Sequence, residues 1–336
     1  MSIVNQNTPE SPLHVGVIGV GHLGGVHAKL WRGIAGAELV ALHDADRARA
    51  EQIAGEHGVR AAADLADLFA SVDAVSIVTP TSTHAEIATA ALEAGKHVFI
   101  EKPITARYHE AEMVIRLAEE RGLVLQVGHI ERFNPAFAAL GEQHLEPMFI
   151  ESHRLAQFRP RATDVAVVLD LMIHDIDLVL ALTGSPVVEV RASGVSVVSD
   201  TTDIANARLE FANGCVANLT ASRISQRQMR KMRLFQKNAY ISIDFAKPSV
   251  ELFRIHDDMS DVKESTMLLG AIEQGTKQRA ITFEQLPTPE VNALAEELRE
   301  FVEAIRTGTS PKVTGRSAAE ALRVAEVIEE KCRENK

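Results

Sequence analysis

The sequence predicts an α/β protein with two domains. A doubly wound parallel sheet forms the N-terminal domain, and the C-terminal domain is α+β with a mostly antiparallel, open sheet. The 336 residues exceed one typical core and suit two domains of roughly 100 to 200 residues each. From Leu13 to about Gly128, short apolar runs alternate with helical patterns. After about Asn134 the predicted strands instead alternate apolar and polar residues.

The N-terminal domain is predicted over residues 13–133. Its strands are runs that are apolar at nearly every position, which suits strands covered on both faces. They are Val15–Ile18, Glu38–Leu42, Ala74–Val78, His97–Ile100 and Leu123–Val127. Intervening segments such as Thr83–Ala94 and Tyr108–Glu120 suit crossover helices. Strands and helices in this alternation predict a parallel sheet with helices on both faces.

The C-terminal domain is predicted over residues 134–336, including the last helices. It contains an amphipathic helix, Val165–Thr183, followed by alternating strands. These are Val187–Val198, Asn206–Phe211, Cys215–Ser222 and Tyr240–Phe245. Asn213-Gly214 predicts a hairpin, because this dipeptide supplies the positive φ angles of a tight turn. Two helices, roughly Pro289–Thr307 and Ser317–Arg333, close the chain.

Composition limits the classes of partner. The net charge of -11 argues against a nucleic-acid partner, since a protein surface that binds nucleic acid has to neutralise its phosphates. A local basic patch could still bind one phosphorylated metabolite. Residues 1–12 are polar and suit a flexible tail better than a signal peptide. No apolar run reaches the ~20 residues that cross a bilayer, so no membrane is expected. Cys215 and Cys332 form no CxxC pair, which fits a reducing cytoplasm.

The strongest local motif is Gly19-Val20-Gly21-His22-Leu23-Gly24, between the first strand and the first helix. Gly19 permits the tight turn, Gly21 admits a pyrophosphate, and Gly24 allows close packing of helix on strand. This is the dinucleotide-binding fingerprint of a Rossmann fold. Asp44, 20 residues after Gly24, suits hydrogen bonds to the ribose hydroxyls, which favours NAD over NADP. The alternative is a glycine turn without a ligand.

Two further segments follow strands at the same edge of the sheet, where ligands of such folds bind. Thr79-Pro80-Thr81 is expected to form a cofactor wall, with His84 just after it, although a simple proline turn would give the same pattern. Glu101-Lys102-Pro103 is expected to contact the cofactor and to place a lysine beside the reacting hydroxyl. That cation would stabilise a developing alkoxide. A solvated lysine is the alternative.

On the Val165–Thr183 helix, Asp170, His174 and Asp177 recur at i, i+4 and i+7 and share one face. Polar groups on an otherwise apolar helix need partners or a task. The alternatives are a structural network between domains and a metal site. Spacing indicates no third metal ligand, so no metal is expected.

These motifs resemble a known family. The Gly19–Gly24 fingerprint, Glu101-Lys102-Pro103 and the run from Asp170 to Asp177 are similar to the signatures of the Gfo/Idh/MocA oxidoreductases. The resemblance implies that Lys102, Asp170 and His174 are catalytic. It also implies a homodimer or homotetramer that associates through the open C-terminal sheet. Many relatives carry asparagine where this chain has Thr81.

A narrower likeness rests on Gly128–Pro135 and Ala221–Ser225, which are similar to segments of UDP-N-acetylglucosamine 3-dehydrogenases. It implies that the C3 hydroxyl of a nucleotide sugar is oxidised, often ahead of an aminotransferase in lipopolysaccharide or surface-sugar synthesis. The residues expected to bind substrate are Lys102, Arg132, Phe133, Asn134, Asp170, His174 and Arg223. A basic cluster would suit the diphosphate, or else line a solvated turn or an oligomer interface. It comprises Arg223, Arg227, Arg230, Lys231 and Arg233.

The resulting hypothesis is hydride transfer from a sugar carbon to NAD. His174 would act as general base, Asp170 would orient His174 or a substrate hydroxyl, and Lys102 would polarise the reacting oxygen. A free polyol such as inositol, or a nucleotide sugar with an N-acetylated uronic acid, is the alternative substrate. A protein that senses the NAD redox state without catalysis is the alternative of another class.

Overall fold

A computed structural model describes residues 11–141, 143–158, 165–258, 262, 266–274 and 277–334. The chain forms two compact units. Unit 1 combines the residues up to His129 with Leu294–Ala319, and unit 2 combines Ile130–Ala293 with the residues from Glu320 onward. Most of the expected N-terminal tail, residues 1–10, lies outside the described residues.

The return of the chain to unit 1 at Leu294 corrects the expected division, which assigned everything after Phe133 to the second domain. Helix α8 (Ala293–Thr307) carries Phe301, which is fully buried. Its ring lies 6.4 Å from that of Trp31 and 5.9 Å from that of Phe99, centroid to centroid. Three large aromatic side chains thus bury one another in unit 1. This burial explains why α8 packs there.

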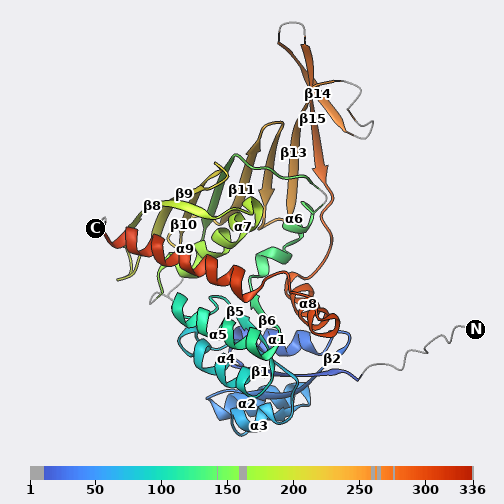
Figure 1. Cartoon of the computed structure of the whole chain (residues 1–336), viewed down its shortest axis with the longest axis vertical. Coiled ribbons are helices and arrows are strands. Elements are labelled where there is room, and N and C mark those ends of the chain that lie inside the picture. Colours follow the sequence, from blue (N-terminus) through green and yellow to red (C-terminus); the bar gives the residue numbers. More distant parts are fainter. Residues whose placement is uncertain are drawn as a thin grey trace, which may run out of the picture. The chain divides into compact units, whose positions relative to one another are not determined.

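Unit 1 contains a six-stranded, wholly parallel sheet in the order β3–β2–β1–β4–β5–β6 (Figure 1). The strands are β1 (Leu13–Ile18), β2 (Ala37–His43), β3 (Arg60–Ala61), β4 (Ala74–Ile77), β5 (His97–Glu101) and β6 (Leu125–Gly128). The prediction of a doubly wound parallel sheet is confirmed. The strand order reverses between β1 and β4, which is where ligands of such sheets bind.

Helices connect these strands. They are α1 (His22–Trp31), α2 (Arg47–His57), α3 (Leu65–Phe69), α4 (His84–Glu93) and α5 (Tyr108–Arg121), with a 3₁₀ turn η1 (Thr81–Thr83) before α4. Helix α2 is capped at its N-terminus by Asp46, whose carboxylate accepts a hydrogen bond from the Arg49 amide, and at its C-terminus by Gly58, which has a φ of 68°. Helix α1 has no such side-chain cap at Gly21.

Unit 2 contains a nine-stranded sheet in the order β14–β15–β13–β12–β11–β7–β10–β9–β8. The strands are β7 (Phe149–Leu155), β8 (Val187–Val195), β9 (Ile204–Phe211), β10 (Val216–Ser222), β11 (Met229–Gln236), β12 (Ala239–Asp244), β13 (Ser249–His256), β14 (Met267–Gln274) and β15 (Lys277–Leu286). Among the described strands of this sheet only β7 and β10 pair in parallel. The mostly antiparallel sheet is therefore confirmed. So is the hairpin between β9 and β10, where Gly214 has a φ of 86°.

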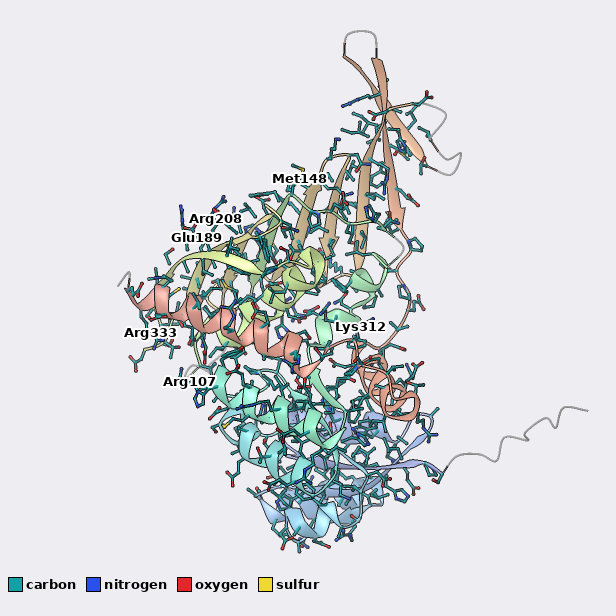
Figure 2. All side chains as sticks on the ribbon, viewed as in Figure 1. Arg107, Met148, Glu189, Arg208, Lys312 and Arg333 are labelled. Carbon is teal, nitrogen blue, oxygen red and sulfur yellow. The ribbon has the colours of Figure 1, made fainter. Side chains whose placement is uncertain are left out.

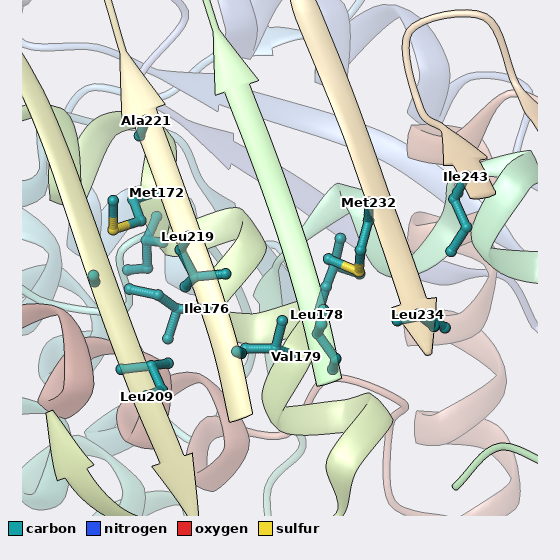
Figure 3. Close-up of a cluster of buried hydrophobic side chains, with 14 of the residues drawn as sticks. Met172, Ile176, Leu178, Val179, Leu209, Leu219, Ala221, Met232, Leu234 and Ile243 are labelled. Atoms are coloured by element: carbon teal, nitrogen blue, oxygen red, sulfur yellow. The ribbon is translucent and has the colours of Figure 1, made fainter. Parts of the chain in front are cut away.

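One face of this sheet is covered by α7 (Ile173–Thr183) and α9 (Gly315–Glu334), as Figures 1 and 3 show. Alternate residues of the strands point into this core. In Figure 3, Leu219 of β10 and Met232 of β11 lie with Ile176 and Val179 of α7. Unit 2 also holds η2 (Ile130–Phe133) and α6 (Pro135–Ala138).

The sequence predicts one regular helix over Val165–Thr183, and the structure departs from this prediction in the first half of the segment. A π-helical turn, η3 (Val168–Met172), precedes α7, and helical structure begins only at Val167. A π turn holds one more residue than an α turn, and such turns occur often at functional sites. Asp170 lies in this turn.

The other face of the unit 2 sheet is open and carries a row of aromatic side chains. Directly paired residues form the row, in the order Phe149, Phe235, Tyr240, Phe253 and Phe283. The ring centroids of successive members lie 6.0, 5.0, 5.6 and 5.1 Å apart. In Figure 2 the labelled side chains of Glu189 and Arg208 project from the side of the sheet away from α9.

Candidate active site

The glycine turn between β1 and α1 has the geometry that the motif predicts. Gly19 has a φ of 85°, and an added Cβ there would lie 2.8 Å from the Val78 carbonyl oxygen. A Cβ on Gly24 would lie 1.8 Å from the Gly19 oxygen, so helix and turn are in contact. A Cβ on Gly21 meets nothing within 4 Å. The turn is thus closed at Gly19 and Gly24 and open at Gly21, where the fingerprint places a pyrophosphate.

The first turn of α1 faces this open space. His22 and Leu23 begin the helix and are exposed, and the helix has no side-chain cap and no acidic residue in its first turn. Its first amide groups are therefore suited to binding an anion. The described residues at this turn fit the pyrophosphate of a dinucleotide.

Asp44, directly after β2, accepts hydrogen bonds within the protein in addition to its predicted role in binding ribose. One carboxylate oxygen accepts a hydrogen bond from the Val20 amide at 2.7 Å, and the other accepts one from the Asp46 amide at 2.9 Å. Asp44 is partly exposed. Its carboxylate thus holds the glycine turn itself, and each oxygen has a second lone pair with which to accept a ribose hydroxyl.

Thr79-Pro80-Thr81 follows β4 at the same edge of the sheet. Thr79 touches the glycine turn, since its Cγ2 would lie 2.8 Å from a Cβ on Gly19. Its hydroxyl accepts a hydrogen bond from Thr83 at 2.9 Å. Pro80 is exposed and Thr81 begins η1. The structure therefore brings Thr79 to the glycine turn, and a contact of Thr81 with the cofactor stays a prediction.

His84, the first residue of α4, is buried between two loops. Its Nδ1 lies 2.8 Å from the Pro103 carbonyl oxygen and its Nε2 lies 2.9 Å from the Thr79 carbonyl oxygen. Burial lowers the pKa of His84, whereas the two carbonyl oxygens and the Glu101 carboxylate act to raise it. The ring connects the loop after β4 to the loop after β5.

Glu101 and Lys102 leave β5 at this edge, and the Lys102–Pro103 peptide is cis. The Glu101 carboxylate points into the unit. One oxygen lies 3.1 Å from Nε2 of His27, and the other accepts a hydrogen bond from the Lys102 amide at 3.3 Å. Lys102 is partly exposed. The known contacts of Glu101 are therefore internal, and its predicted contact with the cofactor stays a prediction.

In unit 2 the three polar residues predicted to share a helix face differ in burial. Asp170 and His174 are partly exposed, whereas Asp177 is buried and accepts a hydrogen bond from Nε of Arg132 at 2.9 Å. Asp177 is thus the partner of another predicted site residue. Asp170 and His174 remain the candidates for chemistry on this helix.

A second ion-pair network lies beside this one. The Arg154 guanidinium, on β7, donates to both oxygens of Asp175 at 2.8 and 3.1 Å and to Glu131 at 2.8 Å. All three side chains are at most 6% exposed. Burial acts to lower the pKa of Arg154, but Asp175 and Glu131 outweigh it and hold this pKa above its ordinary value. The segment with Glu131 and Arg132 is thus joined to α7 directly by the Arg132–Asp177 pair and, through Arg154, by the Glu131–Arg154–Asp175 network.

Phe133 and Asn134 complete the predicted substrate segment. Phe133 is buried. The side-chain Oδ1 of Asn134 accepts from the Ala136 amide at 3.0 Å and caps α6, and its side-chain Nδ2 donates to Glu131 and to the Phe245 carbonyl oxygen. These contacts lie within unit 2. Binding of substrate by Phe133 and Asn134 stays a prediction.

Arg223 does not belong to an open basic surface. It is 6% exposed, its Nε lies 3.7 Å from Asp203, and its guanidinium donates to the Val165 and Thr202 carbonyls. Burial of a charge requires such partners. Three further residues of the cluster face carboxylates: Arg230 faces Glu131, Lys231 faces Asp244 and Arg233 faces Glu151. Arg230, Lys231 and Arg233 are about half-exposed, so of these residues Arg223 alone is buried, and binding of a diphosphate by the cluster stays a prediction.

Two buried residues that bond to site residues were not predicted from the sequence, His27 and Arg154. His27 lies on the buried face of α1 with Gly24, Ala28 and Trp31, a spacing of i, i+3, i+4 and i+7 that would have indicated its burial. Arg154 follows the alternation of β7, where Ile150 and Ser152 are also buried. In neither case does the local pattern indicate the partner.

In the part of the chain that the structure describes, no three His, Cys, Asp or Glu side chains gather as a metal site would require. Nor does any described helix combine the length and apolar character needed to cross a membrane.

Comparisons with known proteins agree with this geometry. Residues 13–129 match the model of an oxidoreductase family with an NAD-binding Rossmann fold, and residues 140–242 match the GFO/IDH/MocA C-terminal domain. The UDP-N-acetylglucosamine 3-dehydrogenase of Acidithiobacillus ferrooxidans is 42% identical over 273 residues, which cover 78% of this chain and 87% of that protein.

A solved structure of that dehydrogenase superposes with a TM-score of 0.86 at 38% identity, covering 96% of this chain and 98% of the other. The scyllo-inositol 2-dehydrogenase (NAD(+)) of Bacillus subtilis is 32% identical over 237 residues, which cover 64% of this chain and 69% of that protein. The relatives include dehydrogenases of both nucleotide sugars and cyclic polyols.

Proposed function

The chain belongs to the Gfo/Idh/MocA family of oxidoreductases, and we propose that it oxidises the C3 hydroxyl of UDP-N-acetylglucosamine to a ketone. As a member it is a dehydrogenase that acts on CH–OH groups with a nicotinamide cofactor. One observation carries the choice of substrate: the 42% identity to the A. ferrooxidans enzyme extends over 87% of that protein. The proposed product suits a following aminotransferase.

We propose NAD as the cofactor. The support is Asp44, whose carboxylate lies beside the glycine turn and would accept ribose hydroxyls but repel a 2′-phosphate. Gly19, Gly21 and Gly24 would hold the pyrophosphate. The bound nicotinamide would accept the hydride of the substrate.

The roles of the catalytic residues follow from their chemistry. His174 would take the proton of the reacting hydroxyl, because a neutral imidazole is a base near physiological pH. Lys102 would stabilise the negative charge that develops on the oxygen. Asp170 would orient His174 or a neighbouring hydroxyl. Arg132, Phe133, Asn134 and Arg223 are proposed to support the substrate, Arg132 and Arg223 in concert with their partners Asp177 and Asp203.

Turnover by the purified protein tests the proposal. Nicotinamide absorbance is followed with NAD or NADP and with UDP-N-acetylglucosamine, its uronic acid analogue or myo-inositol. We expect fastest turnover of UDP-N-acetylglucosamine with NAD. Reduction of the product with borodeuteride, followed by NMR, should place the deuterium at C3. Turnover of inositol alone, or deuterium at another carbon, would contradict the assignment.

Three variants complete this test. Lys102→Ala and His174→Ala should each lower kcat by roughly 100-fold or more, as expected for loss of a general acid–base or charge-stabilising group. His144→Ala is the matched control, because His144 is exposed on the surface of unit 2. Wild-type rates in the first two variants would remove the proposed roles.

An inositol-type polyol is the second candidate substrate. It is favoured by the 32% identity to the scyllo-inositol 2-dehydrogenase of B. subtilis, although that match covers 64% of this chain. Protection against heating separates the two candidates: uridine diphosphate alone should raise Tm if the substrate is a nucleotide sugar.

We propose that the protein is a homodimer or homotetramer that associates through the open face of the unit 2 sheet. The support is the aromatic row from Phe149 to Phe283, which is apolar surface of the kind that interfaces cover. A cytoplasmic location is part of the proposal, because the buried Cys215 and Cys332 are free thiols.

A further inference from the structure

The backbone on both sides of Lys102 is held by buried histidines. Lys102 follows Glu101, whose side chain bonds to the Lys102 amide, and it precedes Pro103, whose carbonyl oxygen lies against His84. Both contacts lie in unit 1. The lysine that the proposed function makes catalytic therefore sits on a loop that is held at each end.

On the first side, His27 of α1 supports Glu101. Its Nε2 lies 3.1 Å from one Glu101 oxygen, and its Nδ1 lies 2.9 Å from the hydroxyl of Ser76 on β4. The His27 side chain is fully buried and that of Glu101 is 12% exposed. Because a carboxylate only accepts, Nε2 is the donor to Glu101, and the Ser76 hydroxyl, which can donate or accept, completes the bonding of Nδ1.

The Glu101 carboxylate has little room to move. It lies against Gly128 of β6, where an added Cβ would approach its oxygens to 2.8 and 3.0 Å. The absence of a side chain at Gly128 thus provides the space that the carboxylate fills. One oxygen of the Glu101 carboxylate bonds to His27 and the other bonds to the Lys102 amide. The position of this carboxylate therefore determines where the backbone leaves β5.

On the second side, His84 joins Pro103 to Thr79. The ring is 1% exposed and its two nitrogens lie 2.8 and 2.9 Å from the two carbonyl oxygens. Neither carbonyl belongs to a strand. His84 therefore holds two irregular loops at a fixed separation, which their own backbone hydrogen bonds would not ensure.

We propose that His27 and His84 are positioning residues that fix the placement of Lys102. This proposal rests on the proposed function, and it assigns a task to two buried histidines outside the proposed catalytic set. Both come from helices of the cofactor site: α1 starts at the glycine turn, and α4 starts just after Thr81. Displacement of a catalytic group by about 1 Å can lower the rate ~100-fold, so such supports matter to the chemistry.

The test uses His27→Ala, His27→Gln, His84→Ala and His84→Gln in the full-length protein, with the exposed His14→Gln as control. A glutamine amide can donate to Glu101 as Nε2 of His27 does, so His27→Gln should recover part of what His27→Ala loses. Folding is checked by circular dichroism, and cofactor binding by NADH fluorescence. If an alanine variant does not fold, the glutamine variant at that position carries the test.

The readout that needs no substrate is modification of Lys102 by trinitrobenzenesulfonate, located by peptide mass spectrometry. A loosened loop should expose the amine, and we expect modification at least about threefold faster in the alanine variants and unchanged in His14→Gln. The Kd for NADH should stay within about twofold. With UDP-N-acetylglucosamine, kcat should fall by roughly 10- to 100-fold with little change in KM.

Folded histidine variants whose Lys102 reacts at the wild-type rate would overturn the proposal. So would a fall in cofactor affinity equal to the fall in kcat, because His27 and His84 would then support the cofactor instead of the lysine. If the wild-type protein turns over no substrate, the proposed function fails. The modification rates still decide whether the histidines hold Lys102.

Discussion

At the scale of single residues, Arg154 connects three elements of unit 2. It lies on β7, and its guanidinium bonds to Glu131 on η2 and to Asp175 on α7. Asp175 neighbours His174, the proposed base. Removal of Arg154 would take the nearest cation from two buried carboxylates and leave Glu131 only the half-exposed Arg230 at 3.7 Å, which is costly because a buried charge needs a close partner.

We therefore predict that Arg154→Met destabilises the protein by about 3–5 kcal/mol, the usual loss when one partner of a buried ion pair is removed. Arg233→Met is the control. Arg233 pairs with Glu151 at 3.4 Å, but its side chain is 52% exposed, and an exposed pair contributes at most about 1 kcal/mol. Urea unfolding followed by circular dichroism measures both. Equal losses in the two variants would contradict a special role for the buried network.

At the scale of elements, β5 shows how the two ends of one strand perform different tasks. Its carboxyl end carries Glu101 and Lys102, and its amino end begins at His97. Nδ1 of His97 accepts a hydrogen bond from the Val124 amide at 3.0 Å, just before β6. An accepting Nδ1 carries no proton, so this bond between neighbouring segments requires the neutral ring.

Burial lowers the pKa of His97 below the ordinary value of 6.5, although the Asp73 carboxylate opposes this shift. The unfolded chain therefore binds more protons than the folded one just below that pH. The stabilising contribution of His97 is fully present above about pH 6.5 and is lost as the pH falls toward the lower pKa of the folded state.

We predict that His97→Asn, whose side-chain oxygen can accept from Val124 but does not titrate, removes this part of the pH dependence. Urea unfolding at several pH values between about 5 and 8 should show the wild-type protein losing stability relative to the variant on acidification. A constant difference across this range would show that His97 does not couple protonation to folding.

At the scale of the whole molecule, the sheet of unit 2 has two different faces. One packs on α7 and α9, and the other carries the aromatic row. Phe235 lies within this row and is 37% exposed. Side chains of this kind in register across five strands form a continuous apolar band, which is unusual on a surface that only water covers.

Phe235→Lys should therefore reduce the oligomer to smaller species, because a charge within the apolar band would be buried without a partner. Sedimentation velocity measures the mass of the wild-type and variant proteins. Met113→Lys, on the exposed side of α5 in unit 1, is the control and should leave the mass unchanged. A wild-type protein that sediments as a monomer would refute the proposed assembly.

Much of the fold could be predicted because its signals are local. Continuous apolar runs indicated the strands of unit 1, and Asn213-Gly214 indicated the hairpin between β9 and β10 in unit 2. The two-residue strand β3 is too short for any period, and the π turn at Val168–Met172 interrupts a pattern that predicted one regular helix. Helix α8 has a clear amphipathic pattern, but that pattern does not say which sheet its apolar face covers.

The sequence by itself determined the glycine turn, since the φ of 85° at Gly19 and the 1.8 Å approach of a Cβ on Gly24 to the Gly19 oxygen both arise within six residues. It also identified Lys102, Asp170 and His174 as candidates. Only the tertiary structure decided which partner each of these polar side chains meets: Asp203 for Arg223, Asp177 for Arg132, and Glu101 for His27. The reason is physical. Steric requirements act between neighbours in the chain, whereas a buried charge is stabilised by groups that folding brings from distant segments.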